Sequence, residues 1–322
     1  MMNVGLAGEF KLVIKDKNGD TKTEIPWQKN LILNQGLDAL ANYGIYSRCL
    51  IGTGNSYPSV TQTALDSFYQ DTYSSVHSNQ FSYDPKIDGD FYKVNRVFKY
   101  IFNIDSDVNI AELGLATSNK VLCTRALIKD ANDNPTIISL LAGEILEVYY
   151  KLWFVVDVRD KTYQINVPTV EGRRIVKTDT YNVIVRPAYV GGSTEGSGSW
   201  SYCVGSEVGI FNGNTNSCYK TGEVRDIYNG PTGTILYSYN PYSNLNYSKS
   251  TYVNGSYYRD FTVHIPVNKG NGSLRSIGQI STMGFWQIRF GRVDDDSPLV
   301  KNNTQKMSVP IRFSWGRYEG EL

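Results

Sequence analysis

The chain has 322 residues, of which 41% are hydrophobic and 20% charged, and this length predicts about two domains. Its 32 Lys and Arg against 31 Asp and Glu give a formal net charge of +1, so electrostatics favours neither nucleic acid nor an anionic membrane as a partner. The sequence has no apolar run of about 18 residues, which excludes a helical membrane span, and its first residues lack the basic region of a secretory signal.

Aromatic residues and glycine dominate the composition, with 24 Tyr, 12 Phe, 5 Trp and 29 Gly. Tyrosine favours half-buried strands, and glycine and asparagine favour the turns between them. We therefore expect a mostly β protein made of two antiparallel β-sandwich or jelly-roll-like domains, with one short helix in the first. Charged residues replace apolar alternation near residue 157, which predicts domains over residues 1–157 and 158–322.

The first predicted element is a β-hairpin. Residues 9–16 alternate between apolar and polar, and residues 21–27 return after Asn18-Gly19. Asn-Gly is the preferred pair of a type I′ turn, in which both central residues have positive φ. The pattern therefore predicts two antiparallel strands joined by a tight type I′ turn.

A short helix is expected after the hairpin. Asn34 is placed to cap its first turn, and Leu37, Leu40 and Ala41 form an apolar stripe that would pack on a sheet. Gly44 would end the helix.

Strands are predicted for most of the first half that follows. They cover residues 91–104, 110–116, 120–128 and 145–158, and the last is the most strand-like run of the chain. We expect this run to be central to a sheet.

Two motifs in the first half are linked by their order. The first is W-x-K-N-L-I-x-N-x-G-L-D-A-L-A, beginning at Trp27, and the second is I-G-T-G-N-x-x-P-x-x-T-Q-T-A-L, beginning at Ile51. The second contains a Gly-Thr-Gly turn, but no Lys-Ser/Thr follows it, so it is not a phosphate-binding loop. Further along lie Asn109–Leu115, with the pattern I-x-E-x-G-L, then Arg125-Ala126-Leu127 and a strand through Leu152-Trp153.

Together these motifs make residues 8–156 resemble the N-terminal module of a group of tailed-bacteriophage virion proteins, described as tail fibre, minor tail or baseplate-associated. The resemblance implies a structural component of the virion, assembled in the host cytoplasm, that serves as a tail, collar or baseplate adaptor or a short fibre. Residues 1–157 would attach to other virion proteins, and residues 158–322 would contact neighbours or a host surface. It also implies a homo-oligomer, no enzymatic activity and no cofactor.

A tyrosine-rich stretch is the candidate interaction surface. Tyrosine alternates with serine or asparagine there, which would place the rings on one face of a strand and form a binding face for glycan or protein. The alternative is that the rings fill the core and the subunit interfaces. The candidates are Tyr237, Tyr239, Tyr242, Tyr247, Tyr252 and Tyr257.

A second class of function is a host-glycan receptor protein or a polysaccharide depolymerase. Paired carboxylates can cleave glycosidic bonds, and Asp84, Asp88 and Asp90 lie among aromatic residues. The run 294–296 has three aspartates, but it lacks the spaced ligands of a calcium loop, so we interpret it as a solvated turn.

The four cysteines give no metal motif. Cys49 and Cys123 lie in apolar runs and are predicted to be buried free thiols. Cys203 and Cys218 flank a loop, so a hairpin bridge is possible in geometry, although a reducing cytoplasm disfavours it. With only two histidines, neither a zinc site nor a catalytic triad is predicted.

Overall fold

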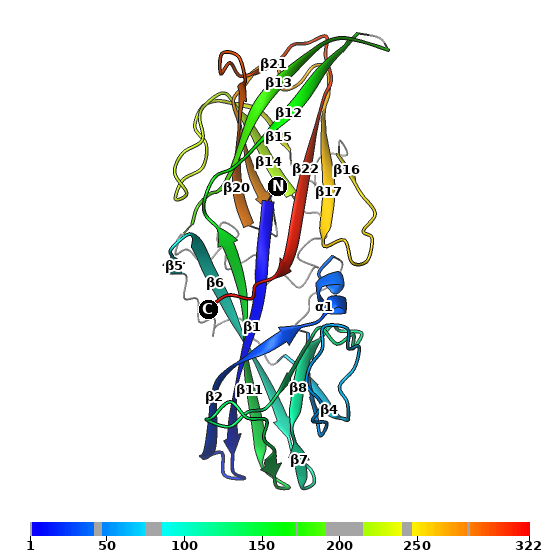
Figure 1. Ribbon diagram of the computed structural model, residues 1–322, viewed down its shortest axis with the longest axis vertical. Coiled ribbons are helices and arrows are strands. Elements are labelled where there is room, and N and C mark those ends of the chain that lie inside the picture. Colours follow the sequence, from blue (N-terminus) through cyan, green and yellow to red (C-terminus); the bar gives the residue numbers. More distant parts are fainter. Residues whose placement is uncertain are drawn as a thin grey trace.

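The computed structural model describes residues 2–41, 47–74, 86–171, 173–190, 215–239, 247–281 and 284–322. It is 60% strand and 2% helix, arranged in several antiparallel sheets, which confirms the predicted mostly β class. The molecule is elongated, with the β12–β13 hairpin at one end and β7 at the other (Figure 1).

The largest sheet has twelve strands in the described part of the chain. Strand β1 lies within it, between β2, β11 and β22. The sheet consists of β1 (Met2–Lys15), β2 (Thr21–Ile32), β3 (Arg48–Gly52), β4 (Phe68–Tyr73), β5 (Lys86–Asp88), β6 (Phe91–Asn103), β8 (Glu112–Ala116), β9 (Thr124–Leu127), β11 (Ile145–Asp157), β16 (Tyr247–Lys249), β17 (Tyr258–Ile265) and β22 (Met307–Arg317).

A second sheet has six strands, in the order β12-β13-β20-β19-β14-β15. Its strands are β12 (Lys161–Glu171), β13 (Arg174–Pro187), β14 (Thr215–Lys220), β15 (Ile235–Tyr239), β19 (Ser276–Ser281) and β20 (Gly284–Arg292). Two small antiparallel pairs complete the fold. They are β7 (Val108–Ile110) with β10 (Ile138–Leu140), and β18 (Gly272–Leu274) with β21 (Leu299–Lys301).

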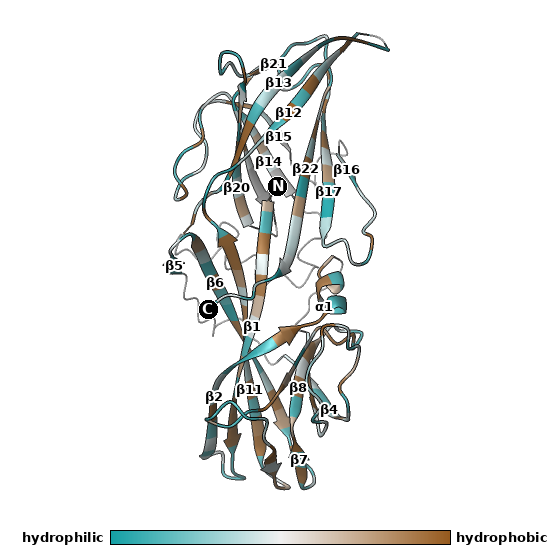
Figure 2. Ribbon diagram, viewed as in Figure 1, coloured by the Kyte–Doolittle hydropathy of each residue, from teal (hydrophilic) through white to brown (hydrophobic). Residues whose placement is uncertain are grey.

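Strand β11 is central, as the sequence predicts. It pairs with β1 on one side and with β6 on the other along almost its whole length. Its mostly apolar residues are visible in Figure 2, and Tyr150, Leu152 and Phe154 are fully buried. Burying a side chain of that size contributes roughly 1.5–3 kcal/mol, so this strand anchors the core of the first half.

The two halves of the chain share the large sheet. The first residues of β1 pair in parallel with the end of β22, from Met2 opposite Phe313 to Leu6 opposite Arg317. Strands β16 and β17 extend the same sheet beyond β22. The predicted boundary at residue 157 does not separate the sheets, because strands from both sides of it belong to one sheet. The division into two domains stays a prediction.

The first hairpin is confirmed, but its predicted turn type is wrong. Of the Asn18-Gly19 pair only Gly19 has a positive φ, at 89°. Its N–H donates to the Asp16 carbonyl oxygen (3.0 Å), so the turn is not type I′. The Asp16 carboxylate accepts hydrogen bonds from the N–H groups of Asn18 (2.8 Å) and Asp20 (3.0 Å), and this stabilises the longer loop.

The helix α1 (Asn34–Ala39) confirms the predicted apolar stripe, since Leu37, Leu40 and Ala41 are buried. The predicted cap is wrong: Leu33 holds the N-cap position and no side chain caps the helix. Asn34 Oδ1 instead accepts a hydrogen bond from Arg317 Nη2 (2.5 Å), because β22 brings this arginine to the start of the helix. Gly44 lies outside the described residues.

Candidate functional site

A buried ion pair lies where the sequence motifs meet. Glu112 is the first residue of β8, Arg125 lies on the paired strand β9, and both side chains are 0% exposed. Arg125 Nε donates to Glu112 Oε2 at 2.8 Å. A buried charge is tolerated only when it is paired and its hydrogen-bonding groups are satisfied, so the surrounding contacts decide what this pair does.

The Glu112 carboxylate holds the Gly-Thr-Gly loop. Its Oε1 accepts from the N–H groups of Gly54 (3.1 Å) and Ser67 (2.9 Å), and its Oε2 accepts from that of Asp66 (3.2 Å). Three backbone donors and one guanidinium therefore surround one carboxylate. Such charge-assisted bonds are about twice as strong as neutral ones, so Glu112 fixes both ends of the loop.

The Arg125 guanidinium holds the same loop at Gln62 and at Asp66. Its Nη1 donates to Gln62 Oε1 and its Nη2 to Asp66 Oδ2, each at 2.8 Å. Hydrogen bonds from Ser56, together with the charge of Arg125, hold the pKa of Asp66 below its ordinary value despite partial desolvation. We call Gln62, Asp66, Glu112 and Arg125 the buried network: Glu112 and Arg125 at its centre are fully buried, and the Asp66 side chain at its edge is 30% exposed. All four lie in or directly beside the sequence motifs described above.

The motif glycines allow the strands and the loop to approach the buried network. A Cβ on Gly54 would lie 2.3 Å from Asp66 Cβ and 2.5 Å from Glu112 Oε1, and a Cβ on Gly114 would lie 2.1 Å from the Thr124 carbonyl oxygen. No side chain fits at these distances. Gly54 and Gly114 are therefore required by close packing around the buried network.

Sequence reasoning missed the pairing of Glu112 with Arg125. A signal existed, because each is a lone charge inside an apolar strand, and such a charge is almost never buried without a partner. Spacing along the chain does not reveal which partner it has.

The candidate tyrosines do not form one row. Tyr237 is buried on β15, in the six-stranded sheet, with its ring centroid 5.8 Å from that of Tyr219. Tyr239 ends the same strand and pairs with Ser217 through the backbone, and Tyr242 lies outside the described residues. Tyr247 begins β16, in the other large sheet. The stretch is therefore divided between two sheets.

Tyr252 and Tyr257 pack against β22. The Tyr252 ring stacks on Trp315 with centroids 5.6 Å apart, and its hydroxyl donates to Asp38 Oδ1 at 2.6 Å. Burial and this carboxylate raise the pKa of Tyr252. The Tyr257 carbonyl accepts from Trp315 N–H at 2.9 Å. These contacts fit the alternative in which the rings fill the core, and the role of the set in binding stays a prediction.

The candidate carboxylates are paired with separate cations. Asp88 contacts Lys93 Nζ at 2.5 Å, and Asp90 contacts Arg159 at 3.2 Å. The hydrogen bond from Lys93 holds the pKa of Asp88 below its ordinary value, whereas the general acid of a glycosidase needs a raised pKa. Asp84 lies outside the described residues.

The aspartate run after β20 is a turn, as predicted. Asp295 contacts Arg292 and Asp296 contacts Arg289, each at 2.5 Å, so arginines occupy these carboxylates. Within the part of the chain that the structure describes, no group of three or more His, Cys, Asp or Glu is placed to hold a metal ion.

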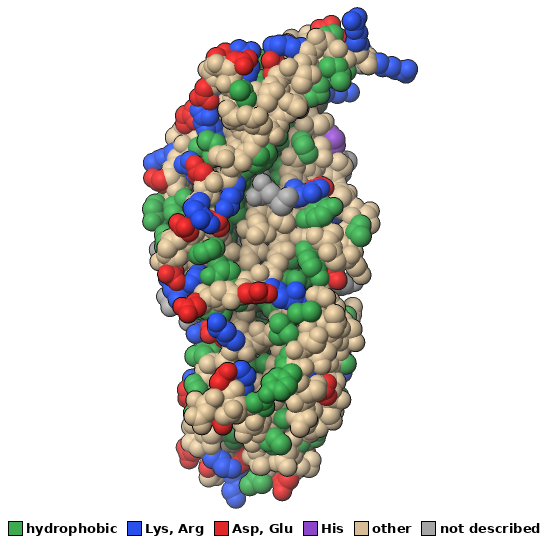
Figure 3. Space-filling view, viewed as in Figure 1, with side chains coloured by type: hydrophobic (Ala, Val, Ile, Leu, Met, Phe, Trp, Pro, Cys, Tyr) green, Lys and Arg blue, Asp and Glu red, His purple; other side chains and the backbone are tan. Residues whose placement is uncertain are grey.

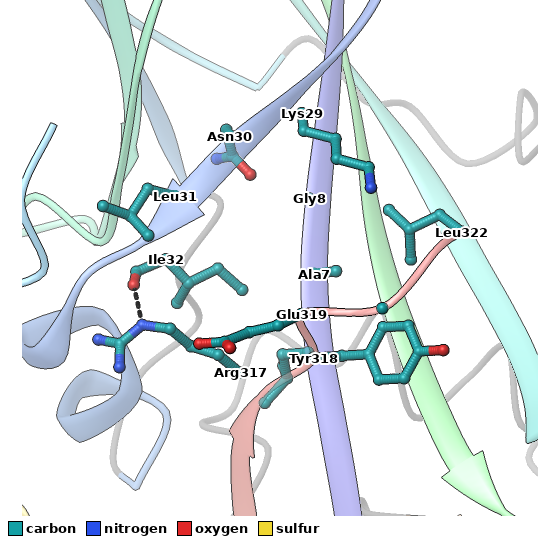
Figure 4. A pocket seen from close by; sticks show the side chains of 12 residues that line it. Ala7, Gly8, Lys29, Asn30, Leu31, Ile32, Arg317, Tyr318, Glu319 and Leu322 are labelled. Atoms are coloured by element: carbon teal, nitrogen blue, oxygen red, sulfur yellow. Dashed lines mark hydrogen bonds between the residues drawn. The ribbon is translucent and has the colours of Figure 1, made fainter. Parts of the chain in front are cut away.

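A cavity of about 170 Å³ lies between β1, β2 and the C-terminal residues (Figure 4). Arg317 Nε donates to the Ile32 carbonyl oxygen at one side, and Lys29 and Glu319 lie around the opening. Clefts that hold drug-sized ligands are larger, at about 300–1,000 Å³. The cavity is therefore smaller than such clefts and lies where the C-terminal segment packs against the first hairpin.

The thiols agree in part with the sequence predictions. Cys49 and Cys123 are confirmed as buried free thiols, and desolvation raises the pKa of each, which makes them unreactive. Cys218 is also free, with its Sγ 3.7 Å from Ser238 Oγ. Cys203 lies outside the described residues.

Comparisons with known proteins provide no relative. No protein-family model, no curated protein and no solved structure matches this chain. None of the helical residues described here forms a segment long and apolar enough to cross a bilayer.

Proposed function

We propose that this chain is a structural component of a tailed-phage virion that acts by protein–protein attachment. It would serve as a tail, collar or baseplate adaptor or as a short fibre. Its partners are other virion proteins and further copies of itself, and it acts without a cofactor or a reaction centre.

The buried network supports this proposal. The resemblance to phage virion proteins depends on short motifs that are far apart in the sequence. Gly54, Glu112 and Arg125 come from three of those motifs, Asp66 directly follows the first of the three, and all four meet in one set of contacts. Motifs that converge in this way act together in the fold of this chain, and this supports reading them as one linked set.

The alternatives have less support. A depolymerase needs a carboxylic acid with a raised pKa, whereas Asp88 and Asp90 are exposed and each is paired with a cation. A glycan receptor built on the tyrosine-rich stretch needs exposed rings, whereas Tyr237 is buried and Tyr252 is stacked on Trp315.

The direct test is to purify tailed particles made by the genome that encodes this chain. We expect mass spectrometry to find the chain in intact particles, and antibody labelling in electron microscopy to place it at one fixed position on the tail, collar or baseplate. Intact particles that lack the chain would overturn the proposal.

A pair of variants sharpens this test. Arg125→Ala disrupts the buried network and should reduce incorporation into particles, whereas Arg289→Ala removes an arginine from a solvent-facing ion pair and should leave incorporation unchanged. Equal incorporation of both variants would show that residues 1–157 do not attach the chain to the particle.

A further inference from the structure

The β12–β13 hairpin extends beyond its sheet. Strand β13 pairs with β20 only from Tyr181 to Pro187. Residues 174–179 pair with β12 alone, from Asp179 opposite Val167 to Arg174 opposite Glu171. An isolated two-stranded ribbon is marginally stable in water, and the hairpin projects from one end of the molecule (Figure 1). Beyond Val167, which packs against the core, it is therefore an arm that lacks a covering layer in the described structure.

The end of this arm is apolar and mainly basic, with Glu171 opposite Arg174 as its acidic residue. Val170, Ile175 and Val176 are 52%, 60% and 47% exposed, and Arg173 and Arg174 beside them are exposed too. No ion pair to either arginine occurs among the described residues. Basic side chains project at this end of the molecule in Figure 3. We call residues 170–177, without residue 172, the arm tip.

Part of the opposite end carries exposed apolar and acidic side chains, beside Lys17 and Lys22 of the first hairpin. Ile137 and Leu141, which flank β10, are 58% and 50% exposed. Asp105 and Asp107 are exposed as well, and neither forms an ion pair with the residues described here. The Ala142 N–H donates to Asp107 Oδ1 at 2.8 Å, which holds Leu141 beside these carboxylates. We call Asp105, Asp107, Ile137 and Leu141 the distal end.

We propose that the arm tip of one copy docks on the distal end of a second copy. Exposed aliphatic side chains would cover one another, and Arg173 and Arg174 would meet Asp105 and Asp107. Complementary charge fixes the register and the partner of such contacts. Because the chain has a net charge of only +1, two copies do not repel one another over long distances.

This contact joins different surfaces of two identical chains. Such a heterologous interface builds a ring where the rotation between copies closes and a fibre where it does not. The arm tip and the distal end lie at opposite ends of the long axis (Figure 1), so copies would follow one another head to tail. The inference rests on the proposed function in one respect, because that function expects a homo-oligomer.

Sedimentation velocity of the purified full chain at increasing concentration tests the contact. We expect concentration-dependent association that weakens as salt is added, because exposed charges are screened. Arg173→Glu with Arg174→Glu should weaken association by roughly a hundredfold or more, because like charges would then face one another. The matched control, Lys269→Glu with Lys306→Glu, changes the charge equally at exposed positions outside the arm and should associate as the wild type does.

A charge swap identifies the partner surface. Asp105→Arg with Asp107→Arg should abolish association, and mixing this variant with the arm variant should restore it, because the basic arm of one then meets the acidic end of the other. Leu141→Ser should also weaken association, because it removes an exposed apolar side chain from the same surface without a change of charge. Circular dichroism confirms that each variant is folded.

Two outcomes overturn the inference. One is a wild-type chain that stays monomeric at every concentration. The other is an oligomer that neither the arm variant nor the distal variants weaken, which would show another interface. A monomeric chain that is nevertheless found in virions would end this inference and leave the proposed function standing, whereas an oligomer that is absent from virions would do the reverse.

Discussion

Two arginine–carboxylate networks, one in each half of the chain, differ mainly in their burial. In the buried network, Arg125 and Glu112 are both 0% exposed. In the second half, Arg289 donates to Glu223 Oε2 (2.7 Å) and Asp296 Oδ1 (2.8 Å), with side chains that are 17%, 53% and 59% exposed. The distances are alike, so geometry alone does not distinguish the two.

Burial decides what each network contributes. Water can solvate the partners of a surface pair when that pair is broken, so such pairs contribute about 0–1 kcal/mol. No water replaces a lost partner in the interior, and the charge that remains is strongly destabilising. The stability of the first half should therefore depend more on Arg125 and Glu112 than that of the second half depends on Arg289.

Replacing the buried arginine should have the largest effect. Arg125→Ala leaves Glu112 buried without its cation, so we expect the free energy of unfolding to fall by roughly 3–5 kcal/mol. Urea denaturation followed by circular dichroism measures the change. A loss below about 1 kcal/mol would show that this pair contributes no more than a surface ion pair does.

Adding one methyl group beside the buried network should have the second-largest effect. The Cβ of Gly54→Ala would lie within 2.5 Å of Glu112 Oε1, and overpacking of this kind costs about 1–3 kcal/mol. Gly19→Ala is not a suitable control, because Gly19 has a positive φ. Gly316→Ala is suitable, because a Cβ there meets nothing within 4 Å. Equal stability of the Gly54 and Gly316 variants would contradict the close approach.

Acid should weaken the buried network through Asp66. Its pKa in the folded protein lies below the ordinary 3.8, chiefly because of the Ser56 hydrogen bond. A lowered pKa stabilises the folded state at neutral pH, and this stabilisation is lost as the pH falls below about 5 and through the folded pKa. Denaturation of wild type and Asp66→Asn over that range should show a stability difference that shrinks with falling pH. A constant difference would contradict the assignment.

Breaking the exposed network of Arg289, Glu223 and Asp296 should give the smallest effect. Arg289→Ala should lower the free energy of unfolding by about 0–1 kcal/mol, and the loss should shrink in high salt. Parallel urea titrations of the Arg289 and Arg125 variants, at low and high salt, compare the two networks directly. A salt-independent loss at Arg289 as large as that at Arg125 would remove the distinction between them.

The sequence predicts local features well. Alternation from residue 145 identifies the central strand β11, and the spacing of Leu37, Leu40 and Ala41 identifies the buried side of the helix. The hairpin around Gly19 is right in position, although Asp16 stabilises a different turn there. Each of these features depends on residues that are neighbours in the chain.

The missed features depend on residues that are far apart. Asn34 does not cap its helix because Arg317, 283 positions later, donates to its side-chain oxygen. The parallel pairing of β1 with β22 joins the two ends of the chain. Alternation of tyrosine with serine or asparagine suggested one strand, but it does not reveal that Tyr237 and Tyr247 belong to different sheets. No local pattern encodes such contacts.

A cryo-electron microscopy map of the purified virions tests the central claim most directly. The account predicts density for this chain at one fixed position, in contact with other virion proteins and without substrate or cofactor density inside either half. The arm tip of one copy should lie on the distal end of the next. A particle without this chain, or a ligand held by converging carboxylates within it, would contradict the account.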